Sequence, residues 1–129
     1  MKRSGILNRH LAGALAELGH GDELLVCDAG MPIPPGPRVV DLAFRAGVPS
    51  FAEVLDGLLA ELVVEGATAA EEVRAASPGT AGLLADRLSA LEYVSHEELK
   101  SRTARARLVV RTGEATPYAN VSLRCGVFF

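Results

Sequence analysis

The sequence predicts an α/β fold: a single compact domain, residues 1–129, with a largely parallel or mixed sheet and helices packed on its faces. Hydrophobic residues make up 49% of the chain and charged residues 22%, so the chain can bury a core. Short apolar runs that suit strands alternate with segments of helical spacing along most of the chain. A length of 129 residues is ordinary for one domain.

The first third of the chain is expected to hold one helix and two strands. Residues 8–18 carry leucines at helical spacing, and Asn8 is placed to cap this helix. The apolar run 23–27 suits a buried strand, and residues 38–42 suit a second one. Between these strands, the four prolines of residues 31–37 exclude a helix, because proline fixes φ and disfavours the α region before it.

Two capping boxes mark further helix starts. Ser50-Phe51-Ala52-Glu53 predicts a helix that runs to about residue 59. Ser95-His96-Glu97-Glu98 predicts a short helix through Lys100, with His96 in its first turn. Each box places a serine oxygen where it can accept a hydrogen bond from a free amide of the first helical turn.

The segment between the two boxes carries weaker signals. Residues 62–64 could form a third strand, and a helix is predicted from about Thr68 to Ala75, ending at Ser77-Pro78-Gly79. A further amphipathic helix is expected here, because one face of it would collect four leucines. These are Leu83, Leu84, Leu88 and Leu91.

The last third of the chain predicts two closing strands, residues 107–111 and 120–125, on either side of a turn-rich loop. A basic stretch overlaps the first of them. We interpret it as a solvated face rather than a nucleic-acid surface, because the formal net charge is -3 and aromatic residues make up only 5%. The stretch comprises Lys100, Arg102, Arg105, Arg107 and Arg111.

Several classes of function lack their motifs. No apolar segment reaches the ~20 residues of a membrane helix, and residues 1–6 lead into no secretory signal, so a cytoplasmic protein is expected. The glycine-rich nucleotide loops and the Gly-x-Ser-x-Gly motif of hydrolases do not occur. No His-x-x-x-His or Cys-x-x-Cys pair is present, so we expect neither a metal nor another cofactor. Cys27 and Cys125 are expected to be reduced, packed side chains.

Acid–base chemistry by side chains remains. His20 lies in a Gly-His-Gly sequence, where small neighbours leave the ring accessible, and imidazole is suited to proton transfer near neutral pH. Asp28 follows the first buried strand, and ligands of α/β sheets usually bind at the carboxyl ends of strands. His96 is free to face a pocket. Each also has a structural alternative, namely a surface His, an Asx turn and a helix-start residue. His10 is expected on the surface.

Five segments together resemble the D-ribose pyranase family and span nearly the whole chain. The most specific are the Cys-Asp-Ala-Gly block and the Arg-Thr-Gly-Glu block that ends in Tyr-Ala-Asn. The related fucose mutarotases share Gly-His-Gly-Asp but differ after the first strand, so ribose is the better match. The chain departs from the family after Pro34 and in its Ala- and Gly-rich middle. The five segments are residues 19–22, 26–34, 47–51, 96–100 and 110–120.

The resemblance implies an isomerase that converts D-ribose between its pyranose and furanose ring forms without a cofactor. It implies an acid–base role for His20 and substrate contacts from Asp28, His96, Tyr118 and Asn120, and all of these residues are present. Two alternatives remain open: a non-catalytic ribose-binding accessory protein of sugar uptake, and a mutarotase of another sugar such as fucose. A structural interaction module is a third.

The resemblance also implies a homo-oligomer built as a ring-based assembly, with each sugar site close to a subunit boundary. Size supports the same expectation, because a small domain leaves apolar surface exposed and such patches commonly mark subunit contacts. The apolar end of the chain, residues 126–129, suits a neighbouring subunit. Alternatively, Phe128 and Phe129 close the core of their own chain.

Overall fold

Six strands form one mixed sheet in the computed structural model, which describes all residues 1–129. They are β1 (Glu23–Cys27), β2 (Arg38–Asp41), β3 (Val64–Ala70), β4 (Leu91–Val94), β5 (Leu108–Arg111) and β6 (Val121–Cys125). Their order in the sheet is β2-β5-β1-β6-β3-β4. β6 runs antiparallel to its neighbours β1 and β3, and the other pairings are parallel. The predicted fold class is confirmed.

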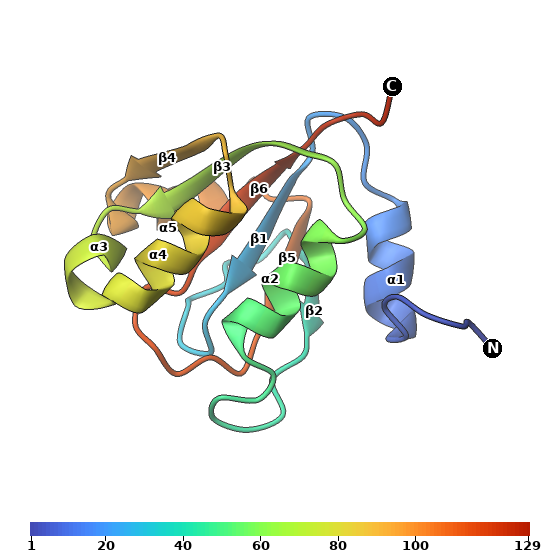
Figure 1. Ribbon diagram of the computed structural model, residues 1–129, viewed down its shortest axis with the longest axis horizontal. Helices are drawn as coiled ribbons and strands as arrows, with labels where there is room; N and C mark the ends of the chain where they lie inside the picture. Colours follow the sequence, from blue (N-terminus) through green and yellow to red (C-terminus); the bar gives the residue numbers. More distant parts are fainter.

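Five helices pack on the two faces of the sheet. They are α1 (Arg9–Ala16), α2 (Phe51–Leu59), α3 (Val73–Ala76), α4 (Pro78–Arg87) and α5 (His96–Thr103). Figure 1 shows α2 and α4 in front of the sheet and α5 behind it. The larger core, a cluster of 20 buried residues, joins the sheet to α1, α2, α3 and α4. No helix has the length and apolar character needed to cross a membrane.

The predicted helix caps are present. The side chain of Asn8 accepts hydrogen bonds from the amides of the first turn of α1. Ser50 Oγ accepts from the Glu53 amide at the start of α2, and Ser95 Oγ accepts from the Glu98 amide at the start of α5, both at 3.1 Å. Because a cap satisfies amides that have no partner within the helix, these serines define where α2 and α5 begin.

The proline-rich loop after β1 covers part of the second face of the sheet. Met31 from this loop packs against Leu25, Cys27 and Val109 in a smaller buried cluster. The chain therefore turns back over the sheet directly after β1. That turn, residues 28–31, lies at the carboxyl edge of β1.

The predicted helix from Thr68 to Ala75 is wrong, because residues 64–70 form β3 and only the single turn α3 follows. Alanine favours a helix by only a few tenths of a kcal/mol per residue over most other residues. In the sheet, β3 gains hydrogen bonds from β6 on one side and β4 on the other. Thr68 to Ala70 are also buried there. Tertiary pairing therefore outweighs the local helix preference.

The predicted amphipathic helix is too long, because α4 ends at Arg87. Leu88 is its C-cap, and Leu91 begins β4, a strand that the sequence does not predict. β4 has only four residues, lies at the edge of the sheet and has no fully buried position. A strand of this kind shows neither an alternating nor a continuously apolar pattern.

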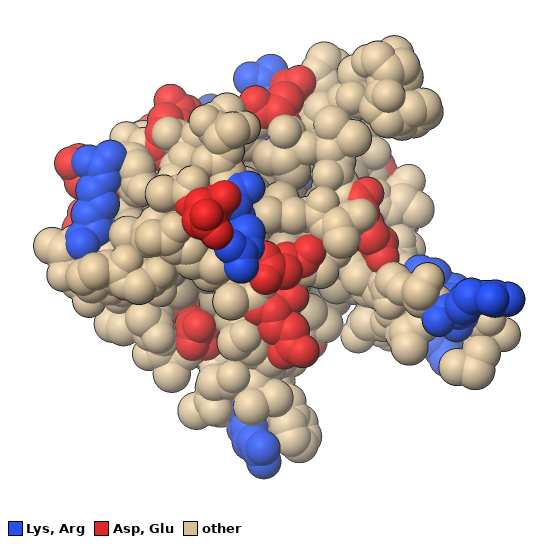
Figure 2. Space-filling model, in the orientation of Figure 1, with Lys and Arg blue, Asp and Glu red and all other residues tan.

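The charged surface is mixed, and Figure 2 shows Lys and Arg in separate patches among acidic side chains on one face. Most of the predicted basic face is solvated as expected: Arg105 and Arg107 are exposed, and Arg102 pairs with Glu98 on α5. Arg111 contradicts that prediction. Its half-buried guanidinium binds Asp41 and a backbone carbonyl, because Arg111 ends a central strand whose neighbour on one side ends in an acidic residue.

Candidate functional site

Four of the five predicted site residues meet at one edge of the sheet. Asp28 follows β1, and His96 follows β4 at the start of α5. Tyr118 and Asn120 precede β6. Because β6 runs opposite to β1 and β3, its beginning lies beside the carboxyl ends of the parallel strands. The position at the carboxyl edge matches the one expected for Asp28.

Asp28 and Asn120 are joined by two reciprocal hydrogen bonds. The Asp28 amide donates to Asn120 Oδ1 at 2.9 Å, and Asn120 Nδ2 donates to Asp28 Oδ2 at 3.0 Å. The Gly30 amide donates to Asp28 Oδ1 at 2.9 Å, so the Asx turn of the structural alternative is present too. Each carboxylate oxygen keeps acceptor capacity, because an ionised carboxylate offers about four lone-pair sites. Asp28 can therefore hold its turn and still accept from a ligand hydroxyl.

Tyr118 has an unusual backbone conformation that orients this part of the site. Its φ is 61°, in the left-handed region that an aromatic residue rarely adopts. The Asn120 amide donates to the Tyr118 carbonyl at 2.9 Å, which closes a tight turn. The ring of Tyr118 lies edge-on to the ring of His96, with centroids 5.0 Å apart and planes at 88°. Strained conformations of this kind collect at binding sites, where neighbouring contacts hold them.

His96 is anchored through its backbone rather than its ring. Its amide donates to both carboxylate oxygens of Glu72, at 3.1 and 2.9 Å. The backbone amide of Glu72 itself and then that of His96 lower the pKa of the Glu72 carboxyl. His96 Nδ1 is buried and has no hydrogen-bond partner. A buried polar atom without a partner costs free energy, so a group that reaches Nδ1 and forms a hydrogen bond with it would remove that cost.

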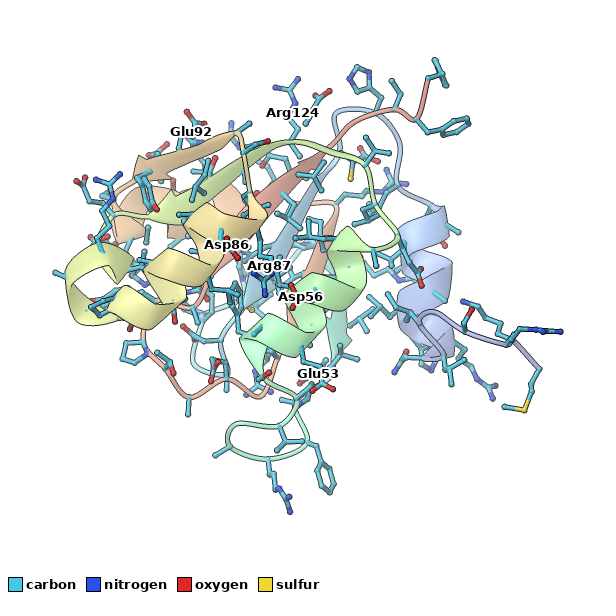
Figure 3. All side chains as sticks on the ribbon, in the orientation of Figure 1. Glu53, Asp56, Asp86, Arg87, Glu92 and Arg124 are labelled. Atoms are coloured by element: carbon cyan, nitrogen blue, oxygen red, sulfur yellow. The ribbon has the colours of Figure 1, made fainter.

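His20 lies at the opposite end of β1, away from the other four residues. Its Nε2 contacts Glu65 Oε2 at 3.0 Å, and Glu65 Oε1 contacts the Nε of Arg124, labelled in Figure 3, at 3.0 Å. Its side chain is 58% exposed. β1 alone separates the two ends by about 13 Å, because a strand rises about 3.3 Å per residue. One chain therefore does not bring His20 to Asp28.

The loop after β5 supports the turn that carries Asp28. Thr112 Oγ1 donates to the Cys27 carbonyl at 2.8 Å, and the Ala29 amide donates to the Glu114 carbonyl at 2.9 Å. Gly113 lies between them, and a Cβ there would collide with the backbone carbonyl of Val48. This close approach explains the glycine in the Arg-Thr-Gly-Glu block. Residues 112–114 of this block support the site by holding backbone.

Neither cysteine is placed for nucleophilic chemistry. Both are free and buried. Burial is the main cause that raises the pKa of the Cys27 thiol to about 12, and burial likewise raises the pKa of Cys125. The two thiols are therefore protonated at neutral pH, and the prediction that they are packed side chains is confirmed. No group of three or more His, Cys, Asp or Glu side chains converges on a point that could hold a metal ion.

The four-residue site has no cavity of its own in the isolated chain. None of the four cavities of the molecule is lined by Asp28, His96, Tyr118 or Asn120. A cleft of about 580 Å³ lies instead at the amino end of β1, next to the turn of His20, where Gly21 and Asp22 line it. Ligand sites are usually concave, so the four residues lack a wall in one chain.

Two residues of the site region were missed by sequence reasoning. Glu72 contacts His96 across 24 positions, and the misassigned helix around it hid that it follows a strand. Arg111 was assigned to a solvated face although its side chain reaches the turn after Asp28. The one available signal for Arg111 was its place in the block that ends in Tyr-Ala-Asn.

Similar proteins point to one family. The chain is 80% identical to "D-ribose pyranase 2" of Streptomyces griseus and 81% identical to "D-ribose pyranase" of Streptomyces avermitilis, each over 100% of both chains. A structure of Bacillus subtilis RbsD complexed with D-ribose matches with a TM-score of 0.96 and 46% identity over 100% of both chains. A fucose mutarotase from Streptococcus pneumoniae, at 23% identity and a TM-score of 0.84 over 100% of both chains, shares the fold. The model of the RbsD / FucU transport protein family matches residues 1–128. The chain therefore belongs to the RbsD / FucU transport protein family.

Proposed function

We propose that the protein is a D-ribose pyranase, an isomerase that interconverts the pyranose and furanose forms of D-ribose. The observation that carries this proposal is the paired Asp28 and Asn120 beside His96 and Tyr118, in a chain whose relatives over its full length are named D-ribose pyranase. A relative of 46% identity is a complex with D-ribose. The distant fucose mutarotase shares the fold and does not favour fucose as the substrate.

The reaction requires only proton transfers from the protein. The two ring forms are cyclic hemiacetals of one open-chain aldehyde, so one ring opens and another hydroxyl attacks the carbonyl carbon. Opening needs a proton delivered to the ring oxygen and one removed from the anomeric hydroxyl, and closure reverses these roles. General acid–base catalysis contributes about 10² to 10⁴-fold, which suits a reaction that already occurs slowly in water.

In this proposal the four residues at the carboxyl edge bind the sugar. Asp28 accepts from sugar hydroxyls with the lone pairs that Gly30 and Asn120 leave free. The unpartnered His96 Nδ1 and the Tyr118 hydroxyl add a partner each. A site of paired polar groups discriminates against a sugar that lacks the matching hydroxyl.

We propose that His20 moves the proton and reaches the sugar from a neighbouring subunit. Two observations support this: His20 and Asp28 lie at opposite ends of β1, and the four-residue site lacks a wall. The turn of His20 is tied to the chain end, because the Gly21 amide donates to the Cys125 carbonyl at 2.8 Å. Phe128 and Phe129 beyond it are each 90% exposed, so they do not close the core of their own chain.

We propose that residues 1–129 act as one functional unit in a homo-oligomer and use no cofactor or metal. A cytoplasmic location is consistent with two free cysteines, since reducing compartments keep thiols reduced. Neither nucleic acid nor a membrane is a proposed partner.

A comparison of sugars tests the proposal against its alternatives. Ring exchange of D-ribose and of L-fucose is followed by magnetisation-transfer NMR with the purified protein, and ribose binding is measured by calorimetry. A pyranase accelerates ribose exchange and affects fucose less. Binding of ribose without acceleration would favour the accessory protein of sugar uptake, and acceleration of fucose alone would favour the mutarotase.

A further inference from the structure

The ends of three neighbouring parallel strands meet in a hydrogen-bonded cluster beside Asp28. β2 ends at Asp41 and β5 ends at Arg111, and these two residues are register partners. Arg111 is also the register partner of Cys27, the last residue of β1. Asp41, Arg111 and Cys27 therefore form one row across the sheet, and Asp28 is the next residue after that row.

The guanidinium of Arg111 uses all three of its nitrogens. Nη1 donates to both carboxylate oxygens of Asp41, at 3.2 and 2.9 Å. Nε and Nη2 both donate to the Ala29 carbonyl, at 3.1 and 2.8 Å. The planar fork of arginine fits this arrangement, because it holds two acceptors in fixed directions.

These contacts fix the Ala29 carbonyl in the turn that follows Asp28. The Ala29 amide donates a hydrogen bond to the Glu114 carbonyl at 2.9 Å. Arg111 is the one side chain that donates to the Ala29 carbonyl. One residue further, the Gly30 amide donates to Asp28 Oδ1. If the Ala29 carbonyl were released, the peptide before Gly30 could rotate and that bond to the carboxylate would weaken.

We propose that Arg111, held by Asp41, is a positioning residue that fixes the Asp28 carboxylate for the sugar. Arg111 acts through the Ala29 carbonyl and does not contact substrate itself. Asp41 belongs to the outermost strand β2, so a residue of β2 helps to fix the turn that follows β1, two strands away. The effect on catalysis rests on the proposed ribose pyranase function, whereas the effect on the turn does not.

Two conservative variants test the inference, Arg111→Lys and Asp41→Asn. Lysine keeps the charge but cannot bind both acceptors as a fork, and asparagine keeps the shape but removes the charge of the partner. Arg87→Lys is the matched control, because Arg87 also binds both oxygens of an aspartate, Asp56, with Nε at 2.8 Å and Nη2 at 3.5 Å. Figure 3 shows Arg87 on α4 and Asp56 on α2 together.

The first measurement is amide hydrogen exchange without sugar. In Arg111→Lys and Asp41→Asn, the Gly30 amide should exchange about tenfold faster than in the wild type, since a charge-assisted hydrogen bond no longer resists opening of the turn. Amides in α2 and β6 should keep their wild-type rates. Arg87→Lys should leave the Gly30 amide unchanged. Wild-type exchange at Gly30 in both site variants overturns the inference, whether or not the protein is an enzyme.

The second measurement separates KM from kcat for ribose, well below the melting temperature of each variant. The site variants should raise KM about tenfold and lower kcat much less, because they displace a binding group and leave His20 in place. Arg87→Lys should keep both constants. Wild-type KM values in both site variants, with an active wild type, would also overturn the inference. An inactive wild type would instead remove the proposed function, and the Gly30 amide would still decide the role of Arg111.

Discussion

Asp28 and Asn120 hold each other through two hydrogen bonds, from the Asp28 amide to Asn120 Oδ1 and from Asn120 Nδ2 to Asp28 Oδ2. The two residues lie 92 positions apart in the chain. They join the end of β1 to the beginning of β6, so the edge that carries the candidate site is fixed by the same antiparallel pairing that forms the centre of the sheet. The site and the fold therefore depend on one another at this point.

Replacing Asn120 by alanine should therefore affect both stability and binding. Asn120 is fully buried, and its loss leaves the Asp28 amide and one carboxylate oxygen without their partner. The free energy of unfolding should fall by about 1 to 3 kcal/mol, and ribose affinity should fall at least about tenfold. Urea denaturation and calorimetry measure the two effects.

Ser122→Ala, two residues further on in β6, is the control for this prediction. Ser122 is also buried, but its hydroxyl makes only a long contact of 3.5 Å with Glu23. It should change stability little and leave ribose affinity at the wild-type value. Equal losses in Asn120→Ala and Ser122→Ala would show that the pairing with Asp28 has no special role.

His20→Gln should abolish most catalysis and leave the fold intact. The side chain is largely exposed, so the free energy of unfolding should stay within about 0.5 kcal/mol of the wild type. Glutamine keeps hydrogen bonding but cannot exchange a proton near neutral pH, so ring exchange should slow by about 10² to 10⁴-fold while ribose still binds. His10→Gln, an exposed histidine without an assigned role, is the control. Near-normal turnover in folded His20→Gln would assign the proton transfer to another group.

Subunit assembly should be required for activity, because we propose that His20 and Asp28 come from different chains. Light scattering should give a mass several times 13.5 kDa, and removal of the exposed Phe128 and Phe129 should lower it. His20→Ala and Tyr118→Ala subunits, each inactive alone, should regain activity when they are refolded together. A fully active 13.5 kDa monomer would refute a site shared between subunits.

The buried thiol of Cys27 should make the protein less stable at high pH. Its pKa is raised from 9.0 to about 12, so the folded state holds the proton more tightly than the unfolded state. This contribution to stability is present below pH 9 and is lost as the pH rises through the raised pKa. At pH 10.5 the loss should be about 2 kcal/mol, at 1.36 kcal/mol per pKa unit. Urea denaturation at pH 8 and 10.5 should show this extra loss in the wild type and not in Cys27→Ala.

The elements predicted well are those with a local physical signal. Asn8, Ser50 and Ser95 are caps whose hydrogen bonds reach only two or three residues along the chain, and all three were predicted. β1 was predicted with its observed bounds, because a short apolar run between polar residues suits a strand that is buried on both faces. β3 was not, because its strand conformation depends on pairing with β6 and β4, which its alanines do not reveal.

The candidate site likewise contains residues that a local pattern predicts and residues that no local pattern predicts. The position of Asp28 at the carboxyl end of β1 follows from the strand pattern, whereas Tyr118 and Asn120 were named only through the family resemblance. The contacts of Glu72 with His96 and of Arg111 with Ala29 join the ends of neighbouring strands. The partners lie 24 and 82 positions apart in the sequence, so no local pattern could predict them. The predicted strand 23–27 already separates His20 from Asp28, whereas only the strand order places His96, Tyr118 and Asn120 on the side of Asp28.

The rate of ring exchange of D-ribose tests the account most directly. Magnetisation transfer between pyranose and furanose signals is measured at increasing protein concentration, with a chelator present and without nucleotide. We predict that the exchange rate rises in proportion to catalytic amounts of wild-type protein and stays near the buffer rate with His20→Gln. An exchange rate that remains at the buffer value with folded, ribose-binding wild-type protein would contradict the account.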